Sequence, residues 1–202
     1  MAMPRLARAV VPNAPHHVVQ RGNRRQRTFF KAADYASYLS IAREQFGNAG
    51  VEVWAYCLMP NHVHLIAAPF DEGSLAIAVG RTHLKYSQYI NAREGWTGSL
   101  WQGRFQSSPM DAAYFERCVK YVGLNPVRAG LVAAASSWPW SSVQAHLGIR
   151  PDRLLTPGPV DALLHREGET FFDSDFGDAE LGGLRASLRT GRPLVEPPRK
   201  LD

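Results

Sequence analysis

Apolar side chains recur with two different periods along residues 16–124, and this predicts a regular succession of strands and helices. Apolar or alternating runs bounded by turn residues predict strands at four places: 16–21, 51–58, 62–68 and 104–110. Spacings of three and four residues predict helices at three places: 33–46, 74–92 and 111–124. The β-α-β-β-α-β order of the first six elements is the split pattern of a ferredoxin-like fold. We therefore expect an α+β architecture in which helices pack on one antiparallel sheet.

The last quarter of the chain is less periodic. Prolines interrupt it at Pro151, Pro157 and Pro159, and it ends in a proline-rich stretch. We therefore expect one domain over residues 1–149. The C-terminal extension over residues 150–202 is expected to be partly helical and then a flexible tail.

Two histidines open the predicted strand 62–68, which we expect at the centre of the sheet. Pro60 and Asn61 mark a tight turn before them, because proline has no amide to donate and asparagine bonds to its own backbone. Side chains alternate along a strand, so His62 and His64 share one face and Val63 points to the other. Two imidazoles on one face supply half of a metal site. The alternative is a pair of polar residues on a half-buried sheet.

The helix 111–124 supplies a second pair of candidate residues. Asp111 is expected as its N-cap, and the helix is expected to stop before Pro126, because proline disfavours a helical conformation in the preceding residue. Tyr121 and Asn125 are four residues apart and therefore share one helix face. The Tyr121 hydroxyl and the Asn125 amide oxygen would then both point toward the element against which that helix face packs. The alternative is a core tyrosine beside a helix-ending asparagine.

Four separated motifs make the chain similar to a known family. They are MPNHVHLI at 59–66, LWQGRF at 100–105, YVGLNPVRAGL at 121–131 and WPWSS at 138–142. In this order they resemble the REP-associated tyrosine transposases, which are single-tyrosine members of the HUH transposases and endonucleases that act on single-stranded DNA. The resemblance extends over residues 4–145.

The resemblance implies a role for each candidate residue. His62 and His64 would be metal ligands, Tyr121 the nucleophile, and Asn125 the third ligand, where relatives often have glutamine, glutamate or histidine. The family suggests Mg²⁺ or Mn²⁺ as the cofactor, whereas ligation by histidines alone would equally allow Zn²⁺. Attack by its tyrosine yields a 5′-phosphotyrosine and a free 3′-hydroxyl, so rejoining needs no nucleotide cofactor. The expected partner is single-stranded DNA with hairpins formed by repetitive extragenic palindromes (REP elements).

Charge is unevenly distributed, and the basic part of the chain coincides with the motifs. Residues 1–150 hold sixteen Lys and Arg against eight Asp and Glu, whereas residues 151–202 hold seven against ten. Basic surfaces attract the phosphates of nucleic acids, and the alternative is a solvated basic loop. The DNA-binding candidates are Arg5, Arg8, Arg21, Asn23, Arg24, Arg25, Arg27, Lys85, Arg104, Lys120 and Arg128. Aromatic residues near these charges would stack unpaired bases where they are exposed: Phe29, Phe30, Trp96, Trp101 and Phe105.

Two other functions fit the same residues. A metal-dependent hydrolase would use water on a phosphodiester without Tyr121, and would recruit imidazoles such as His16, His17, His83 and His146. A protein that binds structured DNA without cleaving it would need no nucleophile. No stretch has the about 20 apolar residues of a membrane span, so we expect a cytoplasmic, nucleoid-associated bacterial protein, as a monomer or a homodimer.

Overall fold

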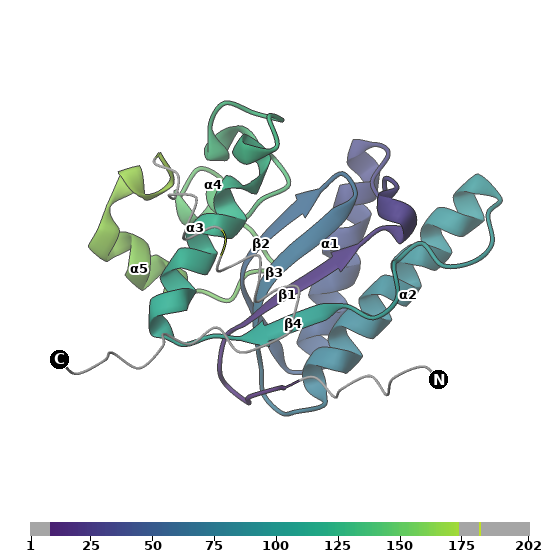
Figure 1. Cartoon of the computed structure of the whole chain (residues 1–202), viewed down its shortest axis with the longest axis horizontal. Helices are drawn as coiled ribbons and strands as arrows, with labels where there is room; N and C mark the ends of the chain where they lie inside the picture. The colour runs from purple at the N-terminus through teal and green to yellow at the C-terminus, as the bar shows by residue number, and fades with distance from the viewer. Residues whose placement is uncertain (1–8, 174–181, 183–202) are drawn as a thin grey trace.

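Four strands form one antiparallel sheet in the spatial order β2-β3-β1-β4 (Figure 1). The structure is a computed structural model and describes residues 9–173 and residue 182. The strands are close to the predicted ones: β1 His16–Arg21, β2 Val51–Met59, β3 His62–Pro69 and β4 Gln106–Pro109. Each β-α-β crossover skips one strand, so β3 and β1 lie at the centre of the sheet. The predicted ferredoxin-like α+β fold is confirmed.

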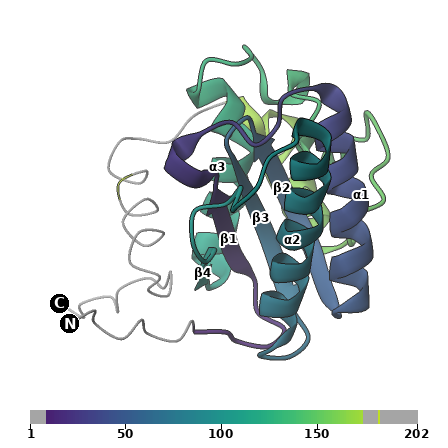
Figure 2. The ribbon, with the colours of Figure 1, turned by 90° about the vertical axis from the view of Figure 1, so that its right-hand side faces the viewer.

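Helices cover both faces of this sheet (Figure 2). α1 Ala32–Asn48 and α2 Ser74–Glu94 pack side by side against one face. α3 Ala112–Arg128 packs against the other face, over β2 and β3. None of the helices in the described part of the chain is long and apolar enough to cross a membrane.

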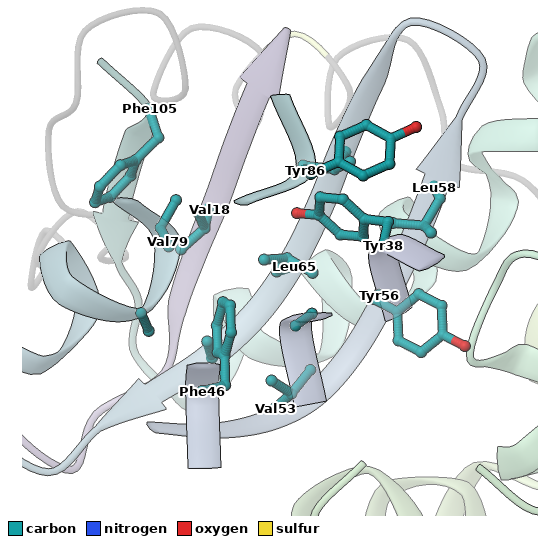
Figure 3. Close-up of a cluster of buried hydrophobic side chains, with 14 of the residues drawn as sticks. Val18, Tyr38, Phe46, Val53, Tyr56, Leu58, Leu65, Val79, Tyr86 and Phe105 are labelled. Atoms are coloured by element: carbon teal, nitrogen blue, oxygen red, sulfur yellow. The ribbon is translucent and has the colours of Figure 1, made fainter. Parts of the chain in front are cut away.

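The two faces of the sheet have separate hydrophobic cores. Val63 and Leu65 belong to the core beneath α1 and α2, where they lie with Tyr38 and other large side chains (Figure 3). Ile66 belongs to the core under α3. Because side chains alternate along a strand, His64 between Val63 and Leu65 faces α3.

α3 begins where predicted but ends later than predicted. Asp111 is the N-cap, and its Oδ1 accepts the backbone N–H of Tyr114 at 3.0 Å. The predicted stop before Pro126 is wrong, because the helix continues to Arg128 with Pro126 inside it. Pro126 is buried in the last turn, and the carbonyl of Asn125 still accepts the N–H of the residue after Arg128 at 3.0 Å. Packing therefore holds this turn helical against the local preference of the residue before proline.

The segment after residue 134 packs beside α3 and along β2 at the edge of the sheet. Its elements are η2 Ala135–Ser137, α4 Val143–His146, α5 Pro159–Glu167 and η3 Glu169–Phe172. Phe172 approaches Gly123 of α3 so closely that a Cβ on the glycine would lie 2.4 Å from Cε1 of the ring. Glycine at this position therefore allows the contact. The division at residue 150 stays a prediction, and the predicted tail, except residue 182, lies outside the described residues.

Candidate functional site

The two histidines at the start of β3 lie side by side on the face that α3 covers. The ring centroids of His62 and His64 are 4.9 Å apart, and the Nδ1 of His62 lies 2.6 Å from Oδ1 of Asn61. Burial lowers the pKa of His62 to about 3 and that of His64 well below its usual value, and the charge of Arg21 acts in the same direction on both. Both rings are therefore neutral near pH 7, which is the form in which imidazole binds a metal.

Tyr121 meets this pair from α3. Its ring centroid lies 5.8 Å from that of His64 in an edge-on arrangement, and only 6% of the residue is exposed. The guanidinium carbon of Arg128 lies 4.4 Å from the centre of the tyrosine ring, and Arg128 Nη2 donates to the Tyr121 carbonyl at 2.5 Å. A cation over an aromatic face is attracted to the ring. Arg128, which the sequence suggested as a DNA contact, thus lies against the candidate nucleophile.

Asn125 lies one helical turn after Tyr121, and its Nδ2 is buried without a hydrogen-bond partner. The Nε2 of His64 is buried without a partner as well. A buried polar atom left unsatisfied costs about 1–3 kcal/mol, so each of these two atoms is free to take a further partner. Since the oxygen and nitrogen of an amide are exchanged by a flip, Asn125 can present its oxygen in the same position.

This donor set fits a divalent cation. Two imidazoles and one amide oxygen make three ligands and leave coordination positions for oxygen atoms of a substrate. The described residues contain no group of three His, Cys, Asp or Glu side chains that could hold a metal ion. Asn125, an amide outside that set that lies one turn after Tyr121 on α3, is the third ligand that the resemblance implies.

His17, which the sequence offered as one of several spare imidazoles for a hydrolase, lies beside His64 and Tyr121. It lies on β1, and its Nε2 is 2.9 Å from Nδ1 of His64. Its ring also meets that of Tyr121 edge-on, with centroids 5.9 Å apart. Burial lowers its pKa to about 3, so the ring is neutral. In the pairing of β1 with β3, His17 lies opposite Ile66 and Val19 lies opposite His64. This register brings His17 close to His64, so His17 could be recognised as a site residue only once the strand pairing was known.

A basic loop follows β1 at the same end of the sheet as His62. It contains the 3₁₀ turn η1 Asn23–Arg25, in which Arg24 and Arg25 have the left-handed φ values 52° and 60°. Non-glycine residues rarely adopt this conformation, so the neighbouring structure must hold it. Gly22 N–H donates to the carbonyl of Asn61 at 2.8 Å, and the Asn61 amide donates to the Arg25 carbonyl at 3.1 Å. The loop is thus tied to the turn that precedes the histidines, and its arginines and Asn23 are exposed.

Two exposed aromatic residues lie near this loop. Phe30 is 40% exposed and Trp96 46% exposed, and their ring centroids are 5.6 Å apart. The guanidinium of Arg93 lies 5.8 Å from the Phe30 ring. The other aromatic residues considered for base stacking are buried in the core beneath α1 and α2: Phe29, Trp101 and Phe105.

The remaining DNA-binding candidates are more scattered. Lys85 pairs with Glu44 at 2.9 Å between α2 and α1, on the opposite face of the sheet from the histidines. Lys120 lies 5.5 Å from the ring of Phe171 in the C-terminal segment, and Arg104 is exposed in the segment before β4. Arg5 and Arg8 lie outside the described residues. Arg21 and Arg128 are the basic candidates whose charges act on His64.

Comparison with known proteins places this site in a family. The sequence model of the family described as "Transposase IS200 like" matches residues 10–125, which include all the residues of the site except Arg128. A protein of Haemophilus influenzae named as a REP-associated tyrosine transposase is 26% identical over 102 residues, and that match spans 45% of this chain and 58% of the relative. A solved structure of a REP-associated tyrosine transposase bound to a REP hairpin shares the fold, with a TM-score of 0.57 and 20% identity. It covers 78% of this chain and 93% of its own.

Proposed function

The chain belongs to the IS200-like transposase family, and from this premise we propose that it cleaves and rejoins single-stranded, hairpin-forming DNA through its own tyrosine. The observation that carries the proposal is the contact between Tyr121 of α3 and His64 of β3, with Asn125 one helical turn further along α3. A hydroxyl beside two neutral imidazoles and an unpartnered amide is an arrangement suited to phosphoryl transfer.

His62, His64 and Asn125 would hold the metal ion, which we propose is Mg²⁺ or Mn²⁺. When bound, such an ion supplies Lewis-acid polarisation of the phosphate and neutralises charge that develops during the transfer. The neutral state of both imidazoles keeps their lone pairs available to it.

Tyr121 would act as the nucleophile. Its oxygen forms a bond to phosphorus while the bond from phosphorus to the 3′-oxygen of the preceding nucleotide breaks. The tyrosine proton leaves the phenol, and the departing 3′-oxygen takes up a proton, so the products are a 5′-phosphotyrosine and a 3′-hydroxyl. The guanidinium of Arg128 lies over the Tyr121 ring, is attracted to its face and helps to hold the ring in position. Because one ester replaces another, the reverse attack by a 3′-hydroxyl rejoins the strand.

The DNA would lie across the end of the sheet where β1 stops and β3 starts. Arg21 is at this end, and the exposed arginines of the loop after it offer forked donors to phosphates. Phe30 and Trp96 beside that loop offer exposed rings on which unpaired bases stack. The relative whose structure was solved is bound to a REP hairpin, and we propose a hairpin of this kind as the substrate.

The site is complete within one chain, since β1, β3 and α3 of the same molecule supply all of its side chains. We therefore propose that a monomer is competent for cleavage. DNA is the expected partner, and the cytoplasm, where bacterial DNA lies, is the expected compartment.

The proposal is tested by incubating the full-length protein with labelled single-stranded hairpins from repeats flanking its gene, with Mg²⁺, with Mn²⁺ or with EDTA. We expect a protein-linked DNA band on denaturing gels that requires metal and is lost in Tyr121→Phe. Tyr114→Phe, on the same helix, is the matched control and should retain the band.

Two results would contradict the proposal. Cleavage that persists in Tyr121→Phe without a covalent adduct would assign the protein to water-dependent hydrolases. Hairpin binding with neither cleavage nor adduct, under either metal, would assign it to DNA-binding proteins without catalysis.

A further inference from the structure

His17 is a fully buried histidine that the proposed reaction leaves without a role. It lies on β1 and faces α3, with none of its surface exposed. Its two neighbours are the two groups on which the reaction depends: His64 at 2.9 Å between ring nitrogens, and Tyr121 with ring centroids 5.9 Å apart. A buried polar ring in such a position requires an explanation.

The short contact between His17 and His64 permits only one proton between the two nitrogens. If Nδ1 of His64 carries it, that nitrogen donates to Nε2 of His17, and Nε2 of His64 keeps a free lone pair. If Nε2 of His17 carries it, His64 accepts through Nδ1 and bears its own proton on Nε2, which then cannot bind a metal. The choice of donor therefore decides whether His64 is a ligand.

The unpartnered atoms favour the first arrangement once a cation is bound. Nε2 of His64 is buried without a protein partner, and so is Nδ1 of His17. In the first arrangement a cation satisfies Nε2 of His64, and the unpaired group is one N–H of His17. In the second arrangement the N–H of His64 and the lone pair of His17 both stay unpaired, and no cation can relieve the first of them. Without a cation each arrangement leaves one N–H and one lone pair unpaired, so it is the bound cation that favours the first.

We propose that His17 is a positioning residue that accepts the Nδ1–H of His64, and thereby keeps Nε2 of His64 free to bind a divalent cation. The proposal rests on the proposed function, since it concerns the same metal site. A partner on the far nitrogen fixes the orientation and proton position of a ligating histidine, and in metalloproteins this partner is usually a carboxylate, a carbonyl or water. Here a second imidazole takes that place, and its edge contact also fixes the spacing between His64 and Tyr121.

The first test reads the proton position without any metal. Full-length protein labelled with ¹⁵N in its histidines is compared by two-bond ¹H–¹⁵N correlation spectra at neutral pH. We expect His64 to be protonated on Nδ1 in the natural protein and to lose that preference in His17→Phe, which keeps a ring but has no acceptor. His17→Gln offers an amide oxygen near the position of Nε2 and should restore the natural pattern. A natural protein with His64 protonated on Nε2 would overturn the proposal.

The second test measures Mn²⁺ binding by electron paramagnetic resonance. We expect affinity to fall about 10- to 100-fold in His17→Phe and to recover in large part in His17→Gln. His16→Gln is the matched control, because His16 is the neighbouring buried histidine of β1, bonds to Val11 and Ala14, and faces away from the site. Unchanged affinity in a His17→Phe protein that unfolds like the natural one would overturn the proposal.

The number of bound histidine nitrogens separates a positioning residue from a ligand. Electron–nuclear spectra of the Mn²⁺ complex with ¹⁵N-labelled histidine should show two coordinated ring nitrogens. Three would make His17 a ligand and overturn its positioning role. Failure of the proposed function gives a different pattern, since the natural protein would then form no covalent adduct, while the metal-free spectra would still report the proton between His17 and His64.

Discussion

Replacing Gly123 by alanine tests whether the C-terminal segment holds the tyrosine helix in place. A Cβ at Gly123 would lie 2.4 and 2.8 Å from two ring carbons of Phe172 and 3.0 Å from Cγ2 of Val143. Ordinary contacts of this kind are 3.4–4 Å, so the ring must move by about an ångström or the helix must shift. Overpacking of a filled core costs about 1–3 kcal/mol.

A second helical glycine, Gly80, serves as the reference that separates the cost of overpacking at Gly123 from the entropy gain of alanine. Alanine in place of glycine within a helix contributes about 1 kcal/mol of stability through backbone entropy, and this gain opposes the overpacking at Gly123. Gly80 of α2 is exposed, and a Cβ there would meet nothing within 4 Å. Gly80→Ala should therefore stabilise the protein by about 0.5–1 kcal/mol. Gly123→Ala should be about 1–3 kcal/mol less stable than Gly80→Ala, because the entropy gain is common to both.

Urea unfolding of the two variants and the natural protein measures this difference through the transition midpoint at constant m-value. We also expect Phe172→Ala to remove most of the cost of the alanine at Gly123, which a double-mutant cycle would detect as a coupling energy. Equal stability of Gly123→Ala and Gly80→Ala would refute the reasoning, because it would mean that the ring of Phe172 does not rest on α3.

Two further predictions concern acid stability and DNA binding. Burial lowers the pKa of His83 to about 3, so below pH 6.5 the unfolded chain binds a proton that the folded protein excludes, and the free energy of unfolding falls by about 1.4 kcal/mol per pH unit for this residue. His83→Gln should therefore flatten the decline in stability between pH 6 and pH 4 by about that slope, and urea titrations with parallel pH dependence in both proteins would contradict it. Arg25→Ala should reduce the slope of log affinity against log salt for a hairpin by about 0.7–0.9, whereas Lys85→Ala should leave it unchanged. If Lys85→Ala changed the slope as much as Arg25→Ala, the result would contradict this prediction. It would indicate that DNA binds on the other face of the sheet.

Much of the fold follows from local pattern. Periods of two and near four residues separated the strands from the helices, and the order of elements then permitted few topologies. The start of α3 was also predictable, because an aspartate N-cap is a local interaction. Its end was not, since Pro126 is buried inside the last turn of the helix. A steric rule on neighbouring residues does not include such packing.

In the candidate site, too, local spacings were predictable from the sequence and contacts between distant segments were not. His62 and His64 are two residues apart on a strand, and Tyr121 and Asn125 are four apart on a helix, so each pair was visible as a local spacing. That α3 covers the histidines is a property of the fold. His17 was one spare imidazole among several, because its contact with His64 depends on the register between strands that are far apart in the chain. Arg128 was read as a DNA contact, and its position over the ring of Tyr121 follows from the extra helical turn beyond Pro126.

The burial of Tyr121 bears on how long the proposed covalent product would last. With 6% of the residue exposed, its oxygen would join the DNA in a place from which bulk water is largely excluded. A phosphotyrosine in the open competes with water for its phosphorus, and hydrolysis there would leave a permanent break. Inside this site the phosphotyrosine linkage would persist until a DNA 3′-hydroxyl attacks it. The packing of α3 on the sheet would thus slow hydrolysis of the linkage and favour rejoining of the DNA strand.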